Sequence, residues 1–152
     1  MTAAYVAIGS NLGDREATIA RALELLDDPP ELRVVRVATV RETAPVGVVD
    51  QPQFLNTVAR LETTLDAREL LDRLLAVERD LGRVRTGERW GPRTLDLDLL
   101  LHGEAVLDEP GLTVPHPRLH ERRFVLEPLS ELAPDLVVPG RGRVKALLAA
   151  LT

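Results

Sequence analysis

The chain has 152 residues, of which 45% are apolar, and its formal net charge is −5. This length and apolar fraction fit one domain over residues 1–152, and the acidic balance argues against non-specific nucleic-acid binding. The sequence contains no cysteine, which excludes disulfides and thiolate metal sites and fits a reducing compartment. The N-terminal residues lack a signal-peptide pattern, and no apolar run approaches the length of a membrane span. We therefore expect a cytoplasmic protein with neither a nucleic-acid nor a membrane partner.

Hydrophobic periodicity predicts six elements in the first two thirds of the chain. In chain order they are a strand over 4–8, a helix over 14–27, strands over 32–40 and 53–62, a helix over 66–81 and a strand over 94–101. The order β-α-β-β-α-β is the ferredoxin-like pattern, an α+β fold in which an antiparallel sheet carries its helices on one face. The other face of the sheet is then free to bind ligands.

The last third of the chain predicts an extension of this fold. Gly103 suggests the turn of a hairpin, and residues 118–132 suggest short helical turns. The apolar spacing of Val144, Leu147 and Leu148 predicts a terminal helix. We therefore expect a C-terminal hairpin followed by a helical extension.

Two aspartates interrupt the strand predicted over residues 94–101. Asp96 and Asp98 alternate with leucines, which places both carboxylates on one face of the strand. Asp is depleted in strands, and like charges on one face repel. A divalent cation such as Mg²⁺, which prefers oxygen ligands, would offset that cost. The alternative is the ordinary polar face of a half-buried strand.

A basic loop precedes the two aspartates. It carries Arg83, Arg85, Arg89 and Arg93 together with Trp90, the only tryptophan of the chain. Guanidinium groups beside a pair of carboxylates suit a polyphosphate such as a triphosphate. The alternatives are a solvated basic loop and a tryptophan that simply packs beneath it.

The strand predicted over residues 53–62 places Phe54 and Asn56 on one face. An aromatic ring beside an amide suits a flat heterocycle with paired donors and acceptors. Phe124 could form the second wall of such a site, and Gly9 would let a ligand approach closely. The alternatives are core phenylalanines, a solvated asparagine and a tight strand-to-helix turn at Gly9.

Glu78 and His116 are the other candidates. Glu78 falls on the apolar stripe of its helix, where a carboxylate is costly unless it has a partner; it is either a helix-edge residue that reaches solvent or a partner of a loop arginine or a ligand. His116 lies between two prolines, which favour extended backbone, and close in sequence to Arg118 and Arg122. A lone histidine is more often structural.

Five segments of the chain resemble a known family. They are AIGSNLG at 7–13, FLN at 54–56, GR at 82–83, RWGPRTLDLD at 89–98 and VPHPR at 114–118. In order and spacing they resemble the 6-hydroxymethyl-7,8-dihydropterin pyrophosphokinases of folate biosynthesis, over nearly the whole chain.

The resemblance implies transfer of pyrophosphate from ATP to the hydroxymethyl group of a reduced pterin, with release of AMP. It implies that Asp96 and Asp98 hold two Mg²⁺ ions and that Arg83 and Arg93 engage the triphosphate. It also implies two sets of ligand contacts. The ATP contacts are Leu71, Glu78, Arg85, Trp90, Leu99, Thr113, His116 and Arg122, and the pterin contacts are Gly9, Thr43, Val46, Phe54, Asn56, Trp90 and Phe124. We also expect a monomer.

Two other functions would fit a ferredoxin-like fold. A module that binds single-stranded RNA would use strand aromatics and a basic sheet face, which the acidic net charge and the two aspartates oppose. A regulatory domain that senses a small molecule would explain a pocket, but it would not need arginines beside paired carboxylates.

Overall fold

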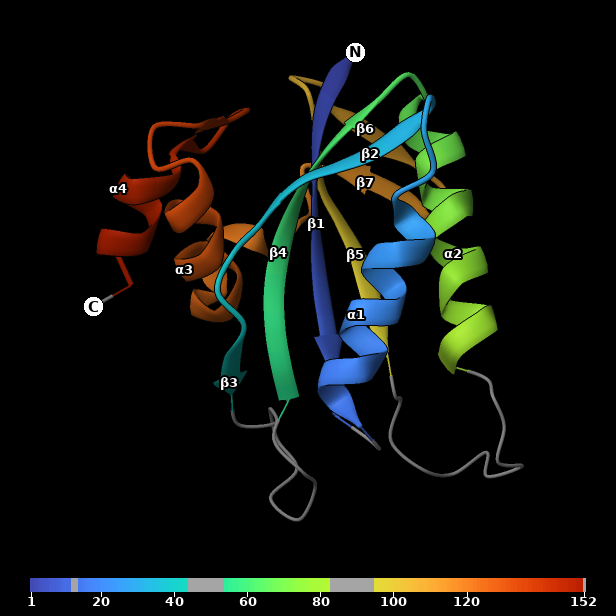
Figure 1. The fold of residues 1–152 in the computed structure, drawn as a ribbon. Coiled ribbons are helices and arrows are strands. Elements are labelled where there is room, and N and C mark those ends of the chain that lie inside the picture. The colour runs from blue at the N-terminus through green and yellow to red at the C-terminus, as the bar shows by residue number, and fades with distance from the viewer. Residues whose placement is uncertain (12–13, 44–53, 83–94, 152) are drawn as a thin grey trace.

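A five-stranded antiparallel sheet forms the centre of the protein, whose computed structural model describes residues 1–11, 14–43, 54–82 and 95–151 (Figure 1). The strands lie in the order β2-β4-β1-β5, and β3 extends the sheet beside β4. Their bounds are β1 (Thr2–Ser10), β2 (Leu32–Val37), β3 (Arg41–Thr43), β4 (Phe54–Thr63) and β5 (Asp96–His102). With α1 (Arg15–Leu26) and α2 (Ala67–Gly82) in their places, this arrangement confirms the predicted ferredoxin-like fold.

Both α1 and α2 begin at residues whose side chains cap the helix. Asp14 caps α1, because its side chain accepts a hydrogen bond from the Ala17 amide at 3.0 Å. Before α2, Asp66 and Glu69 form a reciprocal capping box at 2.8 and 2.9 Å. The apolar stripes of α1 and α2 pack on alternate residues of the strands, so this core is built from one face of the sheet.

A second layer covers part of the opposite face. It consists of a 3₁₀ turn (Leu119–Glu121), α3 (Arg123–Leu132) and α4 (Val144–Ala149), and Figure 1 shows α3 and α4 on the side of the sheet away from α1 and α2. Tyr5, Val58 and Leu100 point to this face and are buried under α3. The face predicted to be free for ligands is therefore covered where its strand residues are apolar. Among the described residues, the end of this face that α3 and α4 do not cover is the one that carries polar residues.

The C-terminal hairpin lies later in the chain than predicted. It comprises β6 (Leu107–Glu109) and β7 (Leu112–Val114), and Gly111 takes a positive φ of 77° at its turn. Gly103 instead turns the chain at the end of β5, where its amide donates to the Ala3 carbonyl at 2.8 Å. A second short pair, β8 (Val137–Val138) and β9 (Gly142–Arg143), precedes α4.

The strand predicted over 32–40 is shorter than expected and is followed by a strand that the pattern missed. β2 ends at Val37, and β3 begins at Arg41. Between them the Thr39 amide donates to the Glu131 carboxylate of α3 and not to β4. Among the described residues, no helix is both long and apolar enough to cross a membrane.

Candidate active site

The end of the sheet that α3 and α4 leave free brings together described residues from three strands. In the register, Gly9 of β1 lies opposite Asn56 on one side and opposite Asp96 on the other. Two residues back along β1, Ala7 lies between Val58 and Asp98. Directly paired residues of an antiparallel sheet share a face, so Asn56, Asp96 and Asp98 all lie on the face that α3 leaves open at this end.

Because Gly9 has no side chain, the side chain of Asn56 can occupy the space beside it. A Cβ atom built on Gly9 would lie 2.8 Å from Asn56 Oδ1 and 3.7 Å from Phe54 Cδ1. The Asn56 amide nitrogen donates a hydrogen bond to the Thr43 hydroxyl, and Thr43 lies opposite Phe54 in the register of β3 and β4. The structure therefore clusters four of the residues expected to contact the pterin: Gly9, Thr43, Phe54 and Asn56.

The two aspartates occupy the strand positions that their spacing predicts. Asp96 and Asp98 are half-buried, and the alternating Leu97 and Leu99 are buried in the core under α2. Within the described ranges, no group of three or more acidic, histidine or cysteine side chains forms a metal cluster. Two carboxylates fit Mg²⁺ nonetheless, because this ion keeps several waters and commonly takes its other ligands from substrate phosphates.

Glu78 reaches from α2 to the strand that carries the aspartates. Its Oε2 accepts a hydrogen bond from the Leu97 amide at 2.7 Å, and the carboxylate is half-buried. A carboxylate on the apolar stripe of α2 is thus satisfied at least in part by the backbone of β5, a partner that sequence reasoning did not consider. Glu78 fixes the strand between Asp96 and Asp98.

We expect Glu78→Leu to lower the free energy of unfolding by about 1–3 kcal/mol, because it leaves the Leu97 amide of β5 without its acceptor. Glu78→Gln is the matched control, since its side-chain carbonyl can still accept that hydrogen bond. Urea unfolding of both variants measures the difference. Equal stability of the two variants would show that the amide of Leu97 does not depend on this side chain.

His116 is placed beside Asp98 by the chain that follows the hairpin. Its backbone amide donates to the Leu100 carbonyl of β5 at 2.9 Å, and its Nδ1 accepts from the Arg118 amide at 3.1 Å. Burial lowers the pKa of His116, Asp98 opposes this effect, and Arg122 and Arg118 add to it. The ring is therefore neutral at pH 7, and with Nδ1 acting as acceptor its Nε2–H is a donor for a ligand.

Phe124 stands at the first turn of α3. The ring is half-buried and packs against the core that α3 shares with the sheet. The Arg122 guanidinium lies over the same ring, with Cζ 5.6 Å from its centroid, within the range of a cation–π contact. Phe124 and Arg122, predicted to contact different ligands, are thus neighbours.

The residues expected around the adenine are only partly brought together. Leu71 of α2 and Leu99 of β5 pack in one core. Thr113 alternates along β7 with Leu112 and Val114, which are buried in that core, and its own side chain is exposed. Thr113 therefore faces away from the two leucines.

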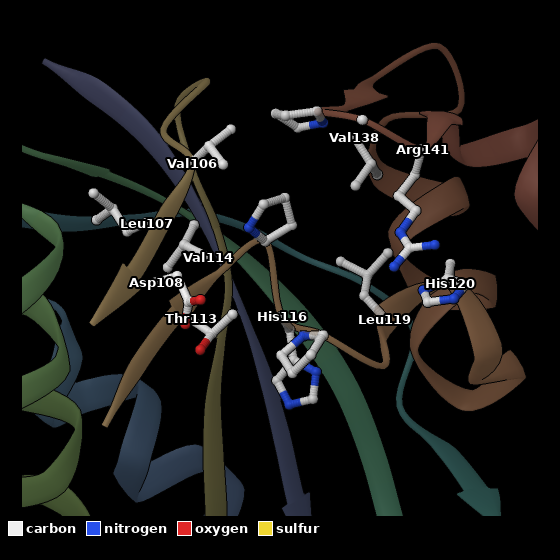
Figure 2. Close-up of a pocket in the computed structure, with 14 residues that line it drawn as sticks. Val106, Leu107, Asp108, Thr113, Val114, His116, Leu119, His120, Val138 and Arg141 are labelled. Carbon is white, nitrogen blue, oxygen red and sulfur yellow. The ribbon is translucent and has the colours of Figure 1, made fainter. Parts of the chain in front are cut away.

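Thr113 and His116 instead line a pocket of about 350 Å³ beside the hairpin (Figure 2). Its walls come from β6 and β7, the segment around Leu119 and the turn that ends at Arg141. None of Phe54, Asn56, Asp96 and Asp98 lines it. The pocket is thus adjacent to the row of polar strand residues and separate from it.

Six predicted site residues lie outside the described residues. They are Val46, Arg83, Arg85, Arg89, Trp90 and Arg93. Their expected roles remain predictions from the sequence.

Comparison with known proteins agrees with this geometry. Residues 5–134 match the model of a protein family described as 7,8-dihydro-6-hydroxymethylpterin-pyrophosphokinase (HPPK). The chain belongs to the HPPK family. It is 51% identical over 146 residues to the 2-amino-4-hydroxy-6-hydroxymethyldihydropteridine pyrophosphokinase of Pseudomonas aeruginosa, covering 96% of this chain and 90% of that protein. The enzyme of the same name from Bacillus subtilis is 47% identical over 129 residues, covering 85% and 77% of the two chains.

Solved HPPK structures share the fold at low sequence identity. A crystal structure of a Plasmodium falciparum HPPK-DHPS triple mutant with STZ-DHP superposes with a TM-score of 0.78 at 13% identity. The match covers 98% of this chain and 43% of the Plasmodium chain, so this chain spans less than half of that longer protein. At this identity the likeness supports the fold alone.

Proposed function

We propose that this HPPK-family chain transfers pyrophosphate from ATP to the hydroxymethyl group of 6-hydroxymethyl-7,8-dihydropterin, with release of AMP, in tetrahydrofolate biosynthesis. Residues 1–152 act as a single pyrophosphokinase domain, as a cytoplasmic monomer. The observation that carries the proposal is the row across three strands that sets Asn56, Gly9 and Asp96 side by side. It joins an amide suited to a heterocycle with a carboxylate suited to a metal–phosphate group.

The pterin would bind at the Asn56 end of the row. Asn56 offers both a donor and an acceptor to the edge of the ring, and Phe54 offers an aromatic face beside it. Because neighbouring strands are about 4.8 Å apart, the backbones of β4 and β5 on either side of β1 are roughly 10 Å apart. A bicyclic ring held at Asn56 would then extend its substituent toward Asp96.

Asp96 and Asp98 would hold two Mg²⁺ ions with the phosphates. When bound, these ions would neutralise phosphate charge and lower the pKa of a nearby hydroxyl. Arg83 and Arg93 would engage the triphosphate, and the neutral His116 would donate from Nε2 beside Arg122. The chain's own contribution is alignment and charge neutralisation, which is most of what phosphoryl-type transfer requires.

The nucleotide would lie on the side of β5 that faces the hairpin. Glu78, Arg85 and Trp90 would contact it, and Leu71, Leu99 and Thr113 would surround the adenine. Among the described residues of this group Thr113 is exposed, Leu71 and Glu78 are partly buried and Leu99 is buried.

The deciding experiment measures AMP release from Mg-ATP with and without 6-hydroxymethyl-7,8-dihydropterin. We expect AMP and the pterin pyrophosphate in equal amounts, only when the pterin is present. Release of ADP, or pterin-independent hydrolysis, would contradict the proposal. A regulatory domain would bind the pterin and release no AMP.

A further inference from the structure

A carboxylate on α3 anchors the backbone that leads into β3. Glu131 accepts hydrogen bonds from the Thr39 amide at 3.0 and 3.2 Å and from the Thr39 hydroxyl at 3.1 Å. The Arg41 guanidinium donates to the same carboxylate at 2.8 Å and to the Thr39 carbonyl at 3.0 Å. Thr39, Arg41 and Glu131 thus form a closed cluster, which we call the β3 anchor.

The β3 anchor is adjacent to the pterin end of the row. β3 has three residues, and in its register with β4 Arg41 lies opposite Asn56 and Thr43 lies opposite Phe54. Thr43 also accepts the hydrogen bond of the Asn56 amide nitrogen. The β3 anchor therefore sets the position of Thr43, the hydrogen-bond partner of the Asn56 amide.

The same helix carries the other wall of the proposed pterin site. Phe124 lies in the first turn of α3 and Glu131 near its last residue, Leu132, and Figure 1 shows α3 and β3 on the same side of β4. The Leu132 carbonyl also accepts from Arg36, which precedes β3, at 3.5 Å. Contacts at the C-terminal end of α3 thus tie the helix that bears Phe124 to the strand that bears Thr43.

We infer that Glu131 is a positioning residue for the pterin site: by holding β3 against α3, it sets Thr43 and Asn56 relative to Phe124. This inference rests on the proposed function. Glu131 has no predicted contact with either substrate, and about 90 residues separate it in sequence from Thr39 and Arg41. It acts only through the elements it joins.

The chemistry of the anchor favours a fixed geometry. Partial burial alone would raise the pKa of Glu131, but hydrogen bonds from Thr39 and Arg41 outweigh it and lower the pKa. The carboxylate is therefore ionised at neutral pH. Its hydrogen bonds are charge-assisted, and such bonds are shorter and stronger than neutral ones. Several donors converging on one planar group define both the distance and the angle between α3 and residues 39–41.

The test compares Glu131→Ala with Glu127→Ala, a matched control on the same helix. Glu127 forms an ion pair with Arg123 at 3.9 Å within α3, so its loss removes a surface charge but leaves the β3 anchor intact. The dissociation constant of 6-hydroxymethyl-7,8-dihydropterin is measured by titrating the pterin into protein that already contains Mg²⁺ and a non-hydrolysable ATP analogue. We expect Glu131→Ala to weaken pterin binding about 10-fold, the scale on which removal of an outer partner affects a binding group. The affinity of Glu131→Ala for the ATP analogue should change less than twofold. The affinity of Glu127→Ala for the pterin should also change less than twofold.

Glu131→Gln adds a graded readout. Its side-chain carbonyl can still accept from the Thr39 amide, but the ion pair with Arg41 is lost, so we expect a weaker effect than that of alanine. Amide exchange of residues 39–43 should rise in the order wild type, Gln, Ala, which a contact with the ligand alone would not produce. Wild-type pterin binding by Glu131→Ala, or equal losses for pterin and nucleotide, would overturn the inference.

Failure of the proposed function would look different. In that case the wild-type protein neither binds the pterin nor releases AMP from ATP. Amide exchange of residues 39–43 would still respond to Glu131→Ala if the anchor holds β3, and an unchanged exchange pattern would overturn the inference whatever the activity.

Discussion

Asp98→Asn is expected to lower kcat by about 10³-fold, the loss that follows removal of one preorganised electrostatic group from an active site. Asn keeps the size of the side chain and removes its charge, so the metal–phosphate group loses one of its two carboxylates. Asp96→Asn should behave in the same way, because the two side chains share one face of β5 and alternate with buried leucines.

Steady-state AMP release at saturating Mg-ATP and pterin measures the effect. Asp72→Asn is the control, because it is the same isosteric substitution at an exposed aspartate of α2 outside the row. Thermal melting separates catalysis from folding. Relief of the repulsion between Asp96 and Asp98 should leave the variant no less stable than the wild type. A near-normal kcat of either folded variant would remove the proposed metal role.

The local patterns of this chain predicted much of what the structure contains. Period-2 alternation placed Asp96 and Asp98 on one strand face, and the Asp14 cap placed the start of α1 within one residue. These features depend on neighbours a few residues apart, for which strand and helix geometry leaves few alternatives. The same logic placed Phe54 and Asn56 on one face, and the register then added Gly9 between Asn56 and Asp96.

The features that the sequence did not predict depend on distant partners. β3 is too short for a periodic pattern, and what fixes the chain before it is Glu131, a residue of α3. The partial cover of the second sheet face depends on the core that Tyr5, Val58 and Leu100 share with α3. The place of Glu78 on an apolar stripe predicts that its carboxylate has a partner, but its acceptor role toward the Leu97 amide of β5 depends on the tertiary arrangement. Each of these needed a contact between elements, about which hydrophobic periodicity carries no information.

Gly9→Ala tests whether empty space at the centre of the row is what places the Asn56 amide. Space is the constraint here, because the structure gives Gly9 no positive φ of the kind recorded for Gly103, Gly111, Gly140 and Gly142. The new Cβ would lie 2.8 Å from Asn56 Oδ1, so the amide, which is held on its β3 side by the Thr43 hydroxyl, cannot keep its present position. A displacement of this order can cost about 10²-fold, and we expect it as a loss of kcat/KM for the pterin with little change in KM for ATP.

A double-mutant cycle with Asn56→Ala identifies the cause of that loss. If Gly9→Ala acts by displacing the Asn56 amide, then adding it to Asn56→Ala should cost almost nothing further, because the group that it displaces is already gone. Two mutations that act independently would instead multiply their effects. Additive free-energy changes would therefore mean that Gly9 serves the site by another route, such as direct approach of the ligand to the β1 backbone. A non-additive cycle would show that the missing side chain of Gly9 and the amide of Asn56 form a single recognition element.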